Sequence, residues 1–154
     1  KQGKVEAQLK LARIYDKGDR VEKNFVYAVK WYEAAAINGK REAQSRLGML
    51  YTQGSQKDYA KAFKWFRRAA KRGDANAQFN LGRLYEAGDG IDKNLEIAVK
   101  WYLMAAKQDH SKAQANLGWM YINGAGVEED LDEATKWYKR AESLGKYPRK
   151  KARN

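Results

Sequence analysis

The chain has 154 residues, and its 31 Lys and Arg against 19 Asp and Glu give a formal net charge of +12. It contains no Cys, which excludes disulfides and thiol catalysis, and no apolar run approaches the roughly 18 residues of a membrane-spanning helix. Leu, Ile, Val and Phe are scarce, but 10 Tyr and 5 Trp bring enough ring surface to build a core against small residues.

The same residue pattern occurs four times along the chain. Trp31, Trp65, Trp101 and Trp137 stand 34 to 36 residues apart, and an Ala-Gln pair recurs at the same interval. The four units cover about residues 5–40, 41–74, 75–110 and 111–145. Such a spacing predicts a repeat architecture in which each unit buries its apolar face against the next.

The first half of each unit predicts a helix. In the first unit, Ala7, Leu11, Ala12 and Tyr15 recur at helical spacing on one face. A glycine follows in every unit, and it is suited to the left-handed residue that ends a helix. These glycines are Gly18, Gly54, Gly88 and Gly124.

The second half of each unit predicts a second helix, since Ala28, Trp31, Tyr32 and Ala35 again share one face. Each second helix follows a residue suited to the N-cap, and these residues are Asn24, Asp58, Asn94 and Asp130. The turn to the next unit uses Gly39, Gly73 and Gly145, with Asp109 in the third unit. The expected fold class is therefore all-α, with about eight helices in four antiparallel pairs.

Residues 88–91 (Gly-Asp-Gly-Ile) and 124–127 (Gly-Ala-Gly-Val) complete a pattern that resembles the Sel-one-like repeat family, a relative of the tetratricopeptide repeat. The resemblance covers about residues 5–145 and implies one right-handed superhelical solenoid over residues 1–145, with the first helices lining a concave groove. It also implies an adaptor that binds other proteins and carries out no catalysis. The chain departs from the family pattern at Ala12 and Arg20, in its short second loop, and in lacking the cysteine pairs of one secreted branch.

Variable positions on the first helices are the candidates for partner contact. If these helices line the groove as in tetratricopeptide arrays, large apolar or Arg side chains face it, and such side chains anchor protein interfaces. The candidates are Leu9, Arg13, Met49, Phe79, Arg83, Trp119 and Ile122. The main prediction is a protein or peptide partner in the concave groove. The alternative is that Phe79 and Trp119 pack against the neighbouring first helix.

A basic stripe is expected on the second helix of the second unit, opposite its small and aromatic residues. Its members are Lys57, Lys61, Lys64, Arg68 and Lys71. This stripe and the basic tail 146–154, which we expect to be disordered, suit an acidic protein, an anionic polymer, lipid head groups or nucleic acid. No nucleic-acid motif accompanies the charge, which disfavours nucleic acid, and a solvated outer face is the simplest explanation.

Enzyme and cofactor chemistry is not expected. His110 is the single His, and no second His, Cys or carboxylate cluster completes a metal site or a catalytic triad. We therefore predict no catalytic residue, no metal and no cofactor. A structural spacer within a longer array is a third possibility for the function.

The last unit carries Trp137, Tyr138 and Leu144 on a helix that no further helix follows in this sequence. Terminal repeats usually present a polar outer side, so the chain is expected either to belong to a longer array or to self-associate through its ends. The compartment is not determined by these residues. A periplasmic or secreted bacterial protein is expected somewhat more than a cytoplasmic one.

Overall fold

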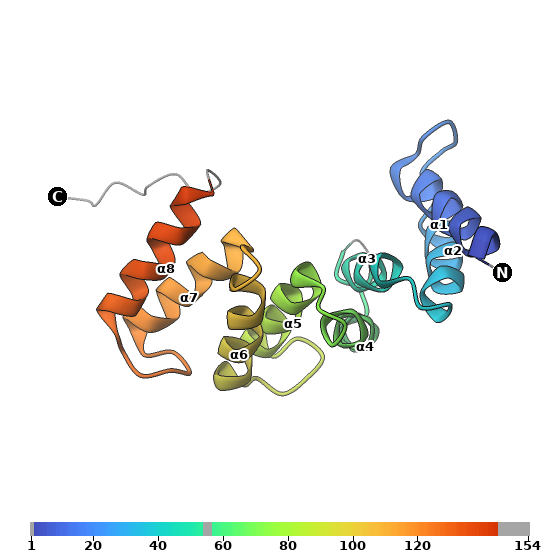
Figure 1. Ribbon diagram of the computed structural model, residues 1–154. Helices are drawn as coiled ribbons and strands as arrows, with labels where there is room; N and C mark the ends of the chain where they lie inside the picture. Colours follow the sequence, from blue (N-terminus) through green and yellow to red (C-terminus); the bar gives the residue numbers. More distant parts are fainter. Residues whose placement is uncertain (1, 54–56, 145–154) are drawn as a thin grey trace. The chain divides into compact units, whose positions relative to one another are not determined.

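The computed structural model describes residues 2–53 and 57–144, and Figure 1 shows the course of the chain. All regular structure in these ranges is α-helical, which confirms the predicted all-α fold. The helices of this part of the chain are α1 (Gln2–Lys17), α2 (Phe25–Ile37), α3 (Arg41–Tyr51), α4 (Tyr59–Ala70), α5 (Ala75–Ala87), α6 (Leu95–Ala106), α7 (Ser111–Asn123) and α8 (Leu131–Ser143).

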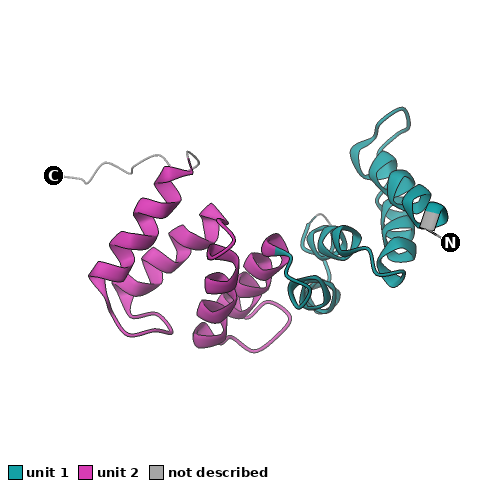
Figure 2. Ribbon diagram, in the orientation of Figure 1, with its two compact units in different colours: residues 1–74 teal, residues 75–154 magenta. Residues whose placement is uncertain are grey.

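The chain divides into two compact units, residues 1–74 and 75–154, which Figure 2 colours separately. In the first unit, α1 packs on α2 and α3 on α4, and in the second, α5 packs on α6 and α7 on α8. The two helices of each pair run antiparallel (Figure 1). Within each unit the pairs are linked by packing of α2 on α3 or of α6 on α7. The single superhelical solenoid over residues 1–145 stays a prediction.

The four predicted N-caps are confirmed. The side-chain oxygens of Asn24, Asp58, Asn94 and Asp130 each accept a hydrogen bond from the backbone N–H three residues later, at 2.8–3.0 Å. This bond satisfies one of the N–H groups that a helix start leaves without a partner.

The predicted helix ends and turns are confirmed where the structure describes them. Gly124 is the left-handed C-cap of α7 with φ +59°, and Asp109 turns the chain into the fourth repeat with φ +60°. A left-handed residue costs little for Gly and is tolerated by Asp. Gly54, Gly145 and the basic tail 146–154 lie outside the described residues.

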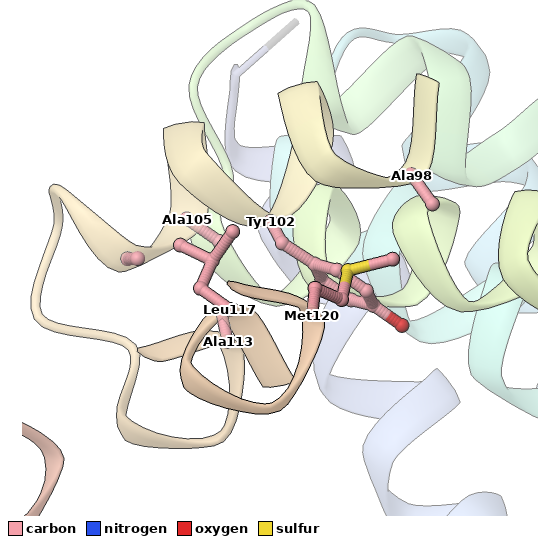
Figure 3. Close-up of a cluster of buried hydrophobic side chains, with 7 residues drawn as sticks. Ala98, Tyr102, Ala105, Ala113, Leu117 and Met120 are labelled. Atoms are coloured by element: carbon pink, nitrogen blue, oxygen red, sulfur yellow. The ribbon is translucent and has the colours of Figure 1, made fainter. Parts of the chain in front are cut away.

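Aromatic rings packed on small residues form the core, as the composition predicts. In the second unit, Tyr102 on α6 is fully buried among Ala98, Ala105, Leu117 and Met120 (Figure 3). The glycine of each Leu-Gly pair is required by close approach, because a Cβ at Gly82 would lie 2.8 Å from the Tyr102 ring. The same contact recurs between Gly48 and Phe66, and between Gly118 and Tyr138.

Two of the repeated glutamines tie one repeat to the next. The side-chain amides of Gln44 and Gln114 donate to the backbone carbonyls of Ala36 and Ala106, both at 3.0 Å. Each bond gives a second donor to a carbonyl at the end of α2 or α6, which also accepts from the backbone N–H of Gly39 or Asp109 in the following turn.

Candidate functional site

In the first unit the predicted groove residues differ in exposure. Arg13 on α1 is exposed and Met49 on α3 is half-buried, whereas Leu9 is buried with 4% exposure. The prediction that Leu9 contacts a partner is therefore wrong. Its equivalent in the next repeat, Ser45, is also buried and donates a hydrogen bond to Asp74 at 3.1 Å, so this repeat position makes contacts within the unit.

In the second unit, Trp119 and Ile122 lie three residues apart on α7 and keep 49% and 43% of their surface exposed. Arg83 on α5 is also exposed. Phe79 is half-buried, because its ring stacks on His110 at 4.6 Å and lies 5.7 Å from the Tyr102 ring. The packing alternative thus describes Phe79, while Trp119 keeps half of its side chain open to solvent.

An ion pair that the sequence analysis missed joins the first helices of the first unit. Glu42 on α3 accepts hydrogen bonds from Nε of Arg13 at 2.9 Å and from its Nη2 at 2.5 Å. The bond to Glu42 raises the pKa of Arg13 above its ordinary value. An alignment of the four repeats on their Ala-Gln pairs identifies opposite charges at the positions of Arg13 and Glu42. It does not reveal that the two side chains are in contact.

A second polar cluster lies in the interior of the first unit. The Asp16 carboxylate accepts hydrogen bonds from Arg46 at 2.6 and 3.0 Å and from the Tyr32 hydroxyl at 3.2 Å. Asp16 is 5% exposed, so it is not available to a partner although its register places it beside the candidate residues. The corresponding pair in the second unit is Tyr102 and Glu86, whose hydroxyl and carboxylate oxygens are 2.5 Å apart.

Three tyrosines that bond to carboxylates hold their protons tightly. Burial, and then the Glu33 carboxylate at 3.2 Å, raise the pKa of Tyr51 to about 12. Burial is also the largest cause of the raised pKa of Tyr32 and of Tyr102, followed by their Asp16 and Glu86 partners. The folded chain therefore favours the neutral phenols over the phenolates that form when the protein unfolds at high pH.

This preference predicts a loss of stability in alkali. An unfolded tyrosine ionises at about pH 10, whereas the folded Tyr102 holds its proton to higher pH. The contribution of the neutral Tyr102 to the free energy of unfolding is thus fully present below about pH 10, and it is lost as the pH rises towards the pKa of the folded state. We expect the free energy of unfolding, measured by urea titration at a series of pH values, to fall above that point. Tyr102→Phe should make the fall shallower, and exposed Tyr27→Phe is the control that should not.

The basic stripe is exposed as predicted by its helical spacing. All five of its residues are exposed, while Ala62, Trp65 and Ala69 on the other face of α4 are buried. Two members have neighbours in the fold, since Lys61 pairs with Asp58 at 3.1 Å and the Arg68 guanidinium lies 4.9 Å from the Trp65 ring. The stripe remains available to an anionic surface.

The described residues lack the features of a metal site and of a membrane span. No group of three or more His, Asp or Glu side chains in these ranges could hold a metal ion. Nor is any helix in them both long and apolar enough to cross a membrane. His110 has a structural role, because its Nδ1 accepts a hydrogen bond from the Ala113 N–H at 3.2 Å and so caps α7.

A shallow hollow lies apart from these candidate residues. It is formed by α6 and the loop after α7, with Glu96, Lys100 and Glu128 among its lining residues. It has charges of both signs and is not enclosed, so it offers less to a ligand than the exposed ring of Trp119.

Comparison with protein families identifies the repeats. The Sel1 repeat matches four times, at residues 5–40, 41–74, 75–110 and 111–146. A search of curated protein sequences finds no match.

Three solved structures with a similar fold come from bacteria. A Sel1 repeat protein from Oxalobacter formigenes is 38% identical with a TM-score of 0.87 over 95% of this chain and 61% of that one. The protective antigen c5321 of uropathogenic Escherichia coli, described as displaying an SLR fold, is 36% identical with a TM-score of 0.87 over 92% of this chain. The chain spans 31% of the length of c5321. Cysteine rich protein B of Helicobacter pylori is 26% identical with a TM-score of 0.65, over 83% of this chain and 93% of that one.

Proposed function

The chain belongs to the Sel1 repeat family, and we propose that it is a scaffold that binds a protein or peptide on the exposed face formed by α5 and α7 of its second unit. Proteins with Sel1 repeats bind other proteins and are typically non-enzymatic scaffolds. The observation that carries the choice of surface is the 49% exposure of Trp119.

Trp119 is a large exposed aromatic side chain between buried core residues of α7. Leu117 and Met120, on either side of it in sequence, are fully buried. Trp is the residue most enriched among the side chains that dominate binding energy in protein interfaces. Exposed Ile122, one turn further along α7, extends the apolar surface on the same side of the helix. Arg13 and Met49 are the proposed contacts in the first unit.

The test begins with a random displayed peptide library, from which binders are selected on the immobilised intact chain. The affinity of an enriched peptide is then measured for the parent and for the variants. We expect Trp119→Ala to weaken binding of an enriched peptide at least about tenfold, which is the usual effect of removing a dominant interface side chain. Met104→Ala is the matched control, because Met104 lies on α6 of the same unit with 46% exposure. It should leave affinity unchanged, and both variants should unfold at the urea concentration of the parent.

Two results would contradict this proposal. One is unchanged peptide affinity in Trp119→Ala. The other is a dimer of the intact chain in sedimentation that Trp119→Ala converts to monomer, because Trp119 would then be covered by a second copy. Self-association through the exposed Leu144 at the end of α8 stays a separate prediction, and it would survive the Trp119 substitution.

A second candidate function is favoured by the exposed basic stripe of α4, which suits an acidic surface. Binding through exposed charges collapses as salt is raised, because ions screen interactions over roughly 10 Å at 0.1 M. Charge reversal at Lys64 and Arg68 would abolish such binding, whereas Trp119→Ala would not affect it. The opposite pattern is expected for the face of α5 and α7.

A further inference from the structure

The ion pair of the first unit shows that side chains from two consecutive first helices, α1 and α3, can meet on their exposed face. Arg13 lies two residues after the repeated Leu of α1, and Glu42 lies one residue before the Ala-Gln pair of α3. Their side chains meet with one carboxylate oxygen accepting from both Nε and Nη2 of the guanidinium. This face of the first unit therefore contains a cation and the carboxylate that neutralises it.

In the second unit the same two repeat positions carry two cations. Arg83 on α5 corresponds to Arg13, and Lys112 on α7 corresponds to Glu42. Both side chains are exposed. Among the described residues, neither makes an ion pair or a side-chain hydrogen bond. A cation thus stands where the first unit provides its own carboxylate.

The nearest acidic residue on α5 is already engaged. Glu86 lies one turn after Arg83, and its carboxylate accepts a hydrogen bond from the Tyr102 hydroxyl at 2.5 Å. The position that holds Arg46 in the first unit is Asn116 in the second, so no guanidinium stands there to bond Glu86, and the Tyr102 hydroxyl is its hydrogen-bond donor. Glu86 is therefore held towards α6 and does not replace the missing partner of Arg83.

We propose that Arg83 and Lys112 bind a carboxylate of the protein partner, in the place that Glu42 occupies beside Arg13. The partner is an acidic segment of a polypeptide, whose neighbouring apolar side chain packs on Trp119. Lys112 and Trp119 are seven residues apart on α7 and so lie on one side of the helix. This inference rests on the proposed function and names the chemistry that the same face recognises.

A carboxylate suits this place for two reasons. A guanidinium forms paired, charge-assisted hydrogen bonds with a planar carboxylate, and the Arg13 pair shows that geometry within this fold. An exposed apolar ring two helical turns from Lys112 on the same side of α7 also matches a polypeptide that carries acidic and apolar side chains together better than it matches a bare phosphate or a phosphate polymer.

The experiment uses a substitution that supplies the carboxylate from the chain itself. Lys112→Glu would recreate the pair of the first unit, so that Arg83 is neutralised by its own chain. We expect it to weaken an enriched peptide from the displayed library at least about tenfold, since charge-assisted hydrogen bonds are among the stronger polar contacts. The urea midpoint of this variant should equal or exceed that of the parent, and Lys112→Arg should retain binding.

Lys100→Glu is the matched control for net charge, because Lys100 is an exposed lysine on α6 of the same unit. It should leave binding close to that of the parent. The enriched peptides should contain Asp or Glu beside an apolar residue, and replacing those acids by Asn or Gln should weaken binding by a similar factor as Lys112→Glu.

Several results would overturn the inference. If enriched peptides bind equally well after their Asp and Glu are replaced by Asn and Gln, the bound group is not a carboxylate. If Lys112→Glu and Lys100→Glu lower the affinity equally, the attraction depends on net charge and not on this place. Competition by inorganic phosphate or by polyuridylate at peptide-like concentrations would assign the site to phosphate. If Trp119→Ala abolishes binding while Lys112→Glu does not, the proposed function stands and this inference fails. Unchanged binding in Trp119→Ala removes the proposed function itself.

Discussion

Trp65→Ala is expected to lower the free energy of unfolding by about 3–5 kcal/mol, the usual cost of truncating a large aromatic side chain in a core. Trp65 on α4 is 7% exposed, whereas the corresponding Trp31, Trp101 and Trp137 are only half-buried. Its loss removes the largest ring of the first unit's core and leaves a cavity that neighbouring helices can fill only in part. The Arg68 guanidinium that lies over the ring also loses its contact.

The measurement is a urea titration followed by far-ultraviolet circular dichroism on the parent and on the variant. Trp119→Ala is the matched control, because it removes the same ring from a half-exposed position and is expected to cost less than about 1 kcal/mol. Equal effects of the two substitutions would show that Trp65 is not part of the core. Because repeats are stabilised mainly by their neighbours, we expect the loss to fall first on the first unit.

Asp16→Ala is expected to cost about 2–3 kcal/mol, because it removes the acceptor of two bonds from Arg46 and one from Tyr32. The Asp16 side chain is only 3% exposed, and losing a buried partner leaves the other groups without compensation. The Arg46 side chain is 35% exposed and regains some solvation, which places the expected cost below that of a fully buried pair.

A double-mutant cycle with Arg46→Ala measures the coupling directly. We expect Arg46→Ala to cost much less in the Asp16→Ala background than in the parent. The comparison pair is Arg13 and Glu42, whose side chains are 45% and 55% exposed and whose coupling should stay below about 1 kcal/mol. Additive effects of Asp16→Ala and Arg46→Ala would contradict the assignment of this cluster as a tie between α1, α2 and α3.

Most local features of the helices could be predicted from the residues alone. The N-cap at Asn24 and the left-handed turn at Asp109 depend on backbone geometry within a few residues, and the local sequence contains all the groups involved. The contact of Gly82 with Tyr102 could be anticipated in kind, since every repeat that has Leu-Gly also has an aromatic residue after its Trp. Periodicity reveals which side of each helix is apolar.

The choice of surface residues was less predictable. The sequence analysis predicts Leu9 as a partner contact, but Leu9 is buried, and at the same repeat position Ser45 is buried and bonded to Asp74 of its own unit. Phe79 lies at the same position and is partly covered by His110. The exposure of a variable side chain depends on the residue that the turn at the end of its repeat places against it, about 30 residues away.

The sequence by itself determined that this chain is an all-α array of four repeats, because helix periodicity, caps and turns are written into short segments and then repeated. Only the tertiary structure decided which charges are neutralised. Arg13 and Arg83 occupy the same repeat position, yet Arg13 pairs with Glu42, whereas the repeat position of Glu42 carries Lys112 in the unit that contains Arg83. Charge pairing acts through a few ångströms of space and has no fixed separation along the chain, so it emerges only when one repeat is laid against the next.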